Sequence, residues 1–202
     1  MNEQQKSERE TIEHLMNKGL EHLRRDECRQ AFAYFRMTIA VAPTFDVPYI
    51  FASRALGSLG DEQGAIEVLK EGLSRKETFD LRDVLATVYA ACEQDDKAVV
   101  EFQRALELNP ESFLTATSLG AAYMRLRKMD EARASLNRAL EIREEFSGAL
   151  AQLAVMAKMN RDYDTAMQYF QRAIVSAQKD NKPELVAHLE SLMEQTRQAH
   201  RG

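Results

Sequence analysis

The residues that could carry chemistry are four histidines, two cysteines and several adjacent carboxylates. His14 and His22 are eight residues apart, about 12 Å along a helix, which is too far to share a metal ion. Cys28 and Cys92 have no histidine beside them, so neither has the arrangement of an activated nucleophile. The sequence has no glycine-rich phosphate loop, HExxH or Gly-x-Ser-x-Gly pattern. We therefore expect a protein that is not an enzyme and that uses no metal or cofactor.

The adjacent carboxylates Asp61–Glu62 and Asp95–Asp96 occur where helices are predicted to begin, and the helix dipole favours negative charge there.

Those helices belong to a repeat. Alanine recurs at spacings of 34, 33, 34 and 34 residues, at Ala31, Ala65, Ala98, Ala132 and Ala166. Twelve residues before each alanine is another small residue: Gly19, Ser53, Ala86, Gly120 and Ala154. Four residues after each alanine is a large apolar one: Phe35, Leu69, Phe102, Leu136 and Phe170. This regularity is typical of a helical repeat array.

The pattern has a physical reason. Two antiparallel helices approach closely only where one side chain is nearly absent, and the large apolar residues then fill the gap to the next repeat. One helix pair cannot bury its apolar face alone, so stacked pairs form a continuous core.

The pattern resembles the tetratricopeptide repeat (TPR) family over about residues 12–178. The family motif, Leu-Gly-x-x-Tyr followed by Ala, Phe, Ala and Pro, is matched by Leu119-Gly120-Ala121-Ala122-Tyr123 with Ala132, Leu136 and Ala139. It is also matched by Leu85-Ala86-Thr87-Val88-Tyr89 with Ala98, Phe102, Ala105 and Pro110. No repeat carries the tryptophan of the family. The resemblance implies an all-α fold, a right-handed α-solenoid of five TPR helix pairs with a C-terminal capping helix.

The predicted domains are an N-terminal extension with the start of the first helix (1–11), the TPR array (12–178), and a capping helix with a tail (179–202). The repeats are expected at 12–45, 46–78, 79–112, 113–146 and 147–178. Helices are predicted at 7–25, 27–41, 47–59, 62–74, 80–92, 96–108, 112–126, 130–142, 147–159, 163–177 and 182–200, with residues 1–7 frayed. Asp46 is the predicted N-cap of the third helix, and Pro48 lies in its first turn.

Four phenylalanines precede the first helices of repeats 2 to 5: Phe45, Phe79, Phe113 and Phe146. We interpret them as hydrophobic staples, in which the residue before the cap packs on the first turn. An aromatic ladder lining a ligand groove is the alternative.

Repeat 2 holds Gly57, Gly60, Gly64 and Gly72, which predicts a locally soft region, with ordinary repeat degeneracy as the alternative.

The formal net charge is −5, and residues 46–112 hold 14 acidic and 7 basic residues, a local net of −7. This acidic surface is either a second binding site or a solvated helix exterior. The overall charge argues against nucleic acid and anionic membrane as partners.

No run approaches the roughly 18 apolar residues of a membrane helix. The polar start and the two widely separated cysteines predict a cytoplasmic protein.

The resemblance implies that first helices line a concave groove, through positions three before, one after and four after the small landmark residue. The predicted protein-binding residues at these positions are Met16, Leu20, Leu23, Ile50, Arg54, Asp83, Thr87, Thr117, Ala121, Met124, Ala151, Val155 and Lys158. Met16 and Leu20 stand where chaperone-tail clamps of this family have polar residues, so a co-chaperone of that type is not expected.

The predicted function is a non-enzymatic protein–protein interaction scaffold. It would bind a peptide or helical segment of a partner in this largely apolar groove, as a chaperone or assembly adaptor. The alternative is a self-assembling structural adaptor, a homo-oligomer whose groove is occupied by another subunit. The identity of the partner, the pathway and the organism cannot be obtained from the sequence.

Overall fold

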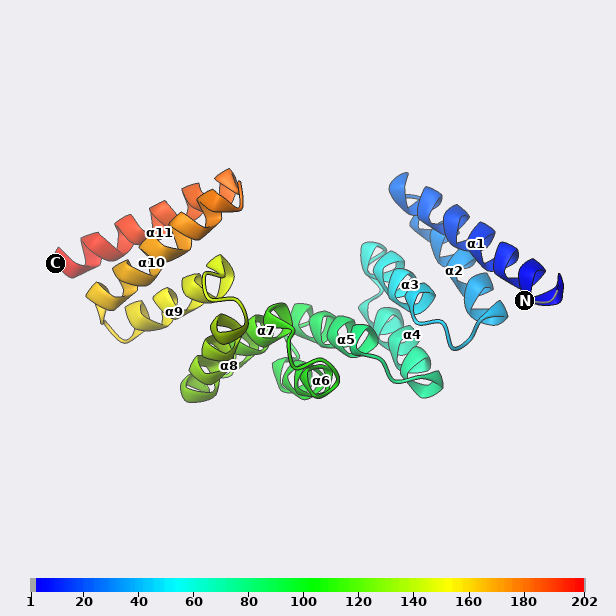
Figure 1. Ribbon diagram of the computed structural model, residues 1–202, viewed down its shortest axis with the longest axis horizontal. Coiled ribbons are helices and arrows are strands. Elements are labelled where there is room, and N and C mark those ends of the chain that lie inside the picture. Colours follow the sequence, from blue (N-terminus) through cyan, green and yellow to red (C-terminus); the bar gives the residue numbers. More distant parts are fainter. Residues whose placement is uncertain (1–2, 202) are drawn as a thin grey trace. The chain divides into compact units, whose positions relative to one another are not determined.

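The computed structural model describes residues 3–201, and within them the secondary structure consists of eleven α-helices without a strand (Figure 1). The all-α class is therefore confirmed. The helices are α1 (Glu3–Arg24), α2 (Cys28–Val41), α3 (Val47–Ser58), α4 (Glu62–Arg75), α5 (Phe79–Ala91), α6 (Asp95–Leu108), α7 (Phe113–Arg125), α8 (Met129–Ile142), α9 (Ser147–Met159), α10 (Tyr163–Lys179) and α11 (Pro183–Arg201).

The predicted helix boundaries agree with the structure to within two residues, except at the start of the chain. There, α1 begins at Glu3. The expectation that residues 1–7 are frayed is therefore wrong for residues 3–7, and residues 1 and 2 lie outside the described part. Side-chain pairs one turn apart support the exposed first half of α1, as between Arg9 Nε and Glu13 Oε1 at 2.8 Å.

The described helices form two compact units that divide between Leu108 and Asn109. In the first unit, α1 pairs with α2, α3 with α4 and α5 with α6, and these pairs stack through α2 on α3 and α4 on α5. In the second unit, α7 pairs with α8 and α9 with α10, and the pairs stack through α8 on α9. Each unit thus repeats the same two-helix element, as the 34-residue period predicts.

The recurring small residues lie at the helix contacts. The five alanines of the period are each at most 1% exposed. A Cβ added at Gly120 would lie 2.8 Å from Cγ of Leu136, and one added at Gly19 would lie 2.5 Å from Cε1 of Phe35. These distances are shorter than a carbon–carbon contact allows, so the close approach requires glycine at both positions.

The last helix, α11, covers the end of the second unit, as expected of a capping helix. Leu189 is 1% exposed and joins a buried cluster with Phe170 and Ile174 of α10. Half-buried residues of α11, among them Leu185 and Leu192, pack against the same cluster. Figure 1 shows α11 running beside α10, which agrees with their contacts.

The staple interpretation is wrong for three of the four phenylalanines. The hydroxyl of Thr78 accepts a hydrogen bond from the backbone N–H of Leu81 at 3.3 Å, which makes Thr78 the N-cap of α5. Ser112 caps α7 in the same way. Phe79 and Phe113 are therefore the first residues of their helices, and Phe146 itself occupies the N-cap position of α9. A staple needs the residue before the cap.

Phe45 does precede the N-cap position, which Asp46 occupies as predicted, although the Asp46 side chain makes no capping hydrogen bond. Pro48 lies in the first turn of α3, also as predicted. Phe113 and Phe146 pack edge to face with ring centroids 4.9 Å apart, and the guanidinium of Arg143 lies 5.2 and 5.5 Å from the two rings. These two rings thus belong to a local packing cluster at the start of α7 and α9.

Three of the four glycines in repeat 2 have a structural reason. Gly60 has a φ of +75° in the turn after α3, a conformation that favours glycine. Gly64 leaves room for the Asp61 carboxylate, which accepts a hydrogen bond from its backbone N–H at 2.9 Å. Gly72 faces Tyr49, and an added Cβ would lie 2.9 Å from Cγ of that ring. Gly57 differs, because an added Cβ would meet nothing within 4 Å.

These contacts predict opposite effects for two glycine-to-alanine substitutions in helices of one repeat. Gly57→Ala should stabilise the protein by about 0.5–1 kcal/mol, because alanine loses less backbone entropy and meets no neighbour. Gly72→Ala should destabilise it by about 1–2 kcal/mol, because overpacking against Tyr49 exceeds the gain in helix propensity. Urea unfolding followed by circular dichroism measures both changes. A stabilising Gly72→Ala would contradict the packing described here.

Candidate functional site

A groove of about 780 Å³ opens in the first unit between α3, α4 and α5, and we call it the α3–α5 groove. Its volume lies within the usual range of about 300–1,000 Å³ for ligand sites. Six apolar residues from the three helices line it: Ile50, Ala65, Ile66, Val84, Val88 and Ala91. Ala65 and Ile66 are buried in the helix packing, whereas Ala91 is exposed. The groove therefore offers an apolar surface built on a rigid core.

Small residues create this space. Gly57, on α3, contributes no side chain to the groove, and no heavy atom lies within 4 Å of where its Cβ would be. Ala65 on α4 and Ala91 on α5 contribute only methyl groups. A larger residue at position 57 would project into open space, so the groove can be filled without disturbing the core.

The polar residues of the groove divide into engaged and unengaged groups. Gln63 Nε2 donates to Glu67 Oε1 at 2.9 Å, and Gln94 Oε1 accepts from Lys97 Nζ at 2.7 Å. The hydroxyl of Thr87 donates to the backbone carbonyl of Asp83 at 2.9 Å. By contrast, the side chains of two further groove residues, Arg54 and Glu62, make no hydrogen bond or ion pair with any other described residue.

Arg54 differs in this from other basic residues of the acid-rich segment 46–112. Arg82 pairs with Glu77 and Glu101 at 2.8 and 2.5 Å. Burial lowers the pKa of Arg82, but hydrogen bonds to Glu101 and Glu77 outweigh this effect and raise it. Arg104 pairs with Glu107 at 2.7 Å. Arg54 is thus an exposed, unpaired cation beside an apolar surface.

The structure brings together three of the thirteen predicted binding residues, Ile50, Arg54 and Thr87, in the α3–α5 groove. Asp83, one turn before Thr87, does not line it. Met16 lines a separate recess of about 410 Å³ with Ile12 and Phe45. The other two predicted residues of α1, Leu20 and Leu23, are half-buried.

The remaining predicted residues belong to the second unit. Thr117 is only 6% exposed, and its hydroxyl donates to the backbone carbonyl of Phe113 at 2.8 Å, so its side chain is not available to a partner. Ala151 and Val155 pack against the buried cluster that α11 covers. Ala121, Met124 and Lys158 are half-buried, as Ala151 and Val155 are, and all five stay predictions.

Sequence reasoning missed the contribution of α4 and of a second face of α5. Glu62 and Ile66 come from a second helix, and the resemblance assigned the groove to first helices alone. Val84, Val88 and Cys92 recur every four residues, which places them on one side of α5. That spacing, together with Gly57 in the mostly apolar helix α3, was the available signal.

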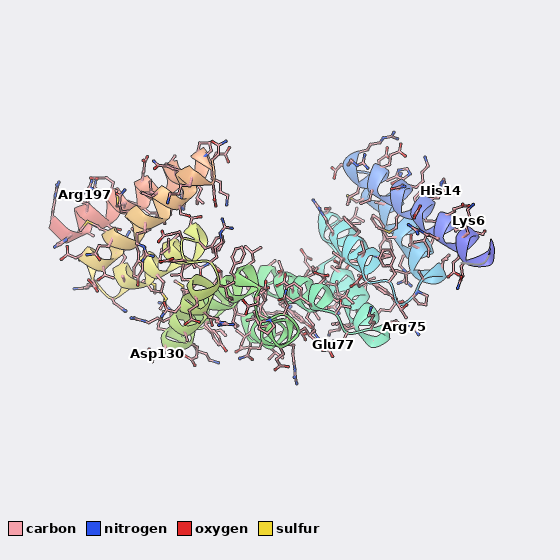
Figure 2. The ribbon with its side chains drawn as sticks, viewed as in Figure 1. Lys6, His14, Arg75, Glu77, Asp130 and Arg197 are labelled. Carbon is pink, nitrogen blue, oxygen red and sulfur yellow. The ribbon has the colours of Figure 1, made fainter. Side chains whose placement is uncertain are left out.

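Other polar clusters of the described residues serve the fold. His22 Nδ1 lies 2.5 Å from Glu27 Oε2, and the His22 ring stacks on Tyr34 with centroids 5.2 Å apart, which ties the turn between α1 and α2. His14 lies on the exposed surface of α1 (Figure 2). No three His, Cys, Asp or Glu side chains among the described residues are grouped to hold a metal ion. None of the described helices combines the length and apolar character needed to cross a membrane.

Comparison with known proteins identifies the repeat. The sequence model described as "Tetratricopeptide repeat" matches residues 80–112 and 116–146. The chain contains tetratricopeptide repeats. The α-solenoid repeat of helix pairs expected for this family is therefore confirmed. A search of curated proteins finds no match by sequence.

Solved TPR structures share the fold at low sequence identity. PilF of Pseudomonas aeruginosa is 15% identical, with a TM-score of 0.73 over 94% of this chain and 93% of that one. MamA of Desulfovibrio magneticus RS-1, residues 41 to the end, is 19% identical, with a TM-score of 0.73 over 84% and 96%. YrrB, described as a TPR protein with an unusual peptide-binding site, is 20% identical, with a TM-score of 0.67 over 88% and 90%. The TPR fold is consistent with a non-enzymatic protein–protein interaction scaffold.

The groove predicts that the two cysteines differ in reactivity. Cys92 lines the groove and is half-buried, whereas Cys28 is 5% exposed. A thiol reagent applied to the native protein should therefore modify Cys92 at least about tenfold faster than Cys28. Mass spectrometry of the two cysteine peptides over time measures the rates.

A filled groove should protect Cys92. Gly57→Phe should slow the modification of Cys92, and Gly57→Ala should leave it unchanged. Equal rates at Cys92 in the Phe and Ala variants would show that position 57 does not open onto the groove.

Proposed function

We propose that this protein is an interaction scaffold that captures a segment of a partner protein in the α3–α5 groove. The observation that carries the proposal is the combination in one groove of an apolar surface and two charged side chains without a partner, Arg54 and Glu62. Such capture suits a chaperone that shields an apolar segment or an adaptor that holds a subunit for assembly.

Apolar contacts would supply most of the affinity. Each large apolar side chain of the partner that becomes fully buried contributes about 1.5–3 kcal/mol, before the cost of ordering the segment. The α3–α5 groove presents Ile50, Val84 and Val88 for such contacts. Because their helices are anchored in the packed core, the surface exists before the partner binds.

Charges would set the position of the partner. Arg54 and Glu62 can each pair with an opposite charge at the edge of the groove without breaking an internal ion pair. A shift of the segment by one residue would lose these pairs. The peptide-binding site in the description of YrrB supports this mode of action, since that protein has a similar fold.

The test compares three baits in a pull-down from native lysate: the wild-type protein, Gly57→Phe and the matched control Gly57→Ala. We expect the wild type and Gly57→Ala to retain the same partner, and Gly57→Phe to lose it because the ring fills the groove. Titration of the purified partner should then show binding to Gly57→Phe weakened by about tenfold or more. Circular dichroism checks that all three baits are folded.

Substitutions outside the groove complete the experiment. Leu20→Asp and Ala121→Asp alter predicted binding residues on α1 and α7. A partner that is retained by Gly57→Phe but lost by either aspartate variant would move the binding site away from the α3–α5 groove and overturn the proposal.

A further inference from the structure

The groove also indicates which conformation its partner adopts, an inference that rests on the function proposed above. An extended segment presents one N–H and one C=O per residue, and each must find a hydrogen bond when it is buried. The uncharged polar side chains of the groove that could serve it are those of Ser53, Gln63, Thr87 and Gln94, and each already makes one hydrogen bond within the protein. An extended backbone would therefore lose more hydrogen bonds to water than these few side chains can replace.

A helix does not have this difficulty. Its backbone groups bond to one another, so it needs only apolar side chains on the face that it buries. The α3–α5 groove offers such a surface through Ile50 on α3 and through Val84 and Val88 on α5. Side chains of a partner helix at positions i, i+3 or i+4, and i+7 would meet this surface together.

The charges restrict the helix further. Arg54 lacks an anionic partner, so the helix should carry a carboxylate beside it. The segment 46–112 has a net charge of −7, and Glu62 lines the same groove, so additional acidic residues on the helix would be repelled. A helix that is neutral or basic overall and has one carboxylate at the edge of its apolar face fits both conditions.

We infer that the α3–α5 groove binds an amphipathic α-helix of a partner protein, neutral or basic overall, that places one carboxylate beside Arg54. The helix conformation follows from the few uncharged polar side chains that the groove offers to a buried backbone, and the single carboxylate follows from Arg54 within an acidic surface. The helix docks on a surface that is already formed, so the protein itself changes little on binding.

Synthetic probes test this inference. The first is a stapled helix of about 15 residues with leucines on one face, lysines on the other and one glutamate at the boundary. The second is identical except that the glutamate is lysine. The third keeps the residues of the first but replaces the staple with two central prolines, which prevents the helix. Fluorescence anisotropy measures Kd of each for the wild type, Arg54→Glu, Gly57→Phe and Gly57→Ala.

We expect the wild type and Gly57→Ala to bind the glutamate helix about tenfold or more tightly than the lysine helix or the proline-containing probe. Arg54→Glu should reverse the preference between the two helices, because the residue at position 54 then attracts the lysine. Gly57→Phe should bind none of the probes. Circular dichroism shows whether the variants remain folded.

The outcomes separate this inference from the proposed function. The helix inference falls if the proline-containing probe binds as tightly as the glutamate helix, or if no probe binds although Gly57→Phe loses the natural partner. The carboxylate inference falls if Arg54→Glu leaves the preference unchanged. If Gly57→Phe binds the probes as tightly as the wild type does, the α3–α5 groove is not the binding site, and the proposed function falls as well.

Discussion

The close approach of paired helices is the interaction on which the rest of this structure depends. Phe35 can contact the backbone of α1 only because residue 19 is glycine, and Leu136 can contact α7 only because residue 120 is glycine. Each contact buries a large side chain completely and fixes the position of one helix on the other. Since neighbouring pairs then share these buried side chains, a short two-helix element becomes a stable repeat.

The α3–α5 groove is a place where the same kind of residue has a different effect. Gly57 has no neighbouring atom within 4 Å of an added Cβ, so it leaves open space. Gly19 and Gly120, by contrast, allow a side chain of the paired helix to make close contact. The space is bounded by apolar side chains whose helices are fixed elsewhere in the core. One helical glycine therefore leaves this groove open without weakening the contacts that hold the repeat together.

The sequence predicts the fold well because the fold depends on residues that recur. The spacing of Ala31, Ala65 and their equivalents predicts the helices nearly to the residue, since each marks an obligatory contact. The caps are less well predicted. Thr78 and Ser112 cap their helices through local hydrogen bonds that no period dictates, so Phe79 and Phe113 lie two positions after the place that a staple residue would occupy.

The candidate site was predicted only in part, for a related reason. Ile50, Arg54 and Thr87 follow from the positions that the family resemblance assigns to first helices, and they do line the groove. Other residues that line the groove, such as Glu62 and Ile66, lie on α4. Ile66 is also a core residue, so its sequence position indicates packing. Only three-dimensional structure shows that one edge of the core remains open.

Site-specific photocrosslinking tests most directly whether a partner contacts the α3–α5 groove. A photoreactive phenylalanine analogue would replace Thr87, which is exposed within the groove, and, as the matched control, Val100, which is 53% exposed on α6 and does not line it. We expect irradiation in the presence of the partner to yield a crosslink from position 87 and none from position 100. A crosslink from position 100 with none from position 87 would contradict this expectation.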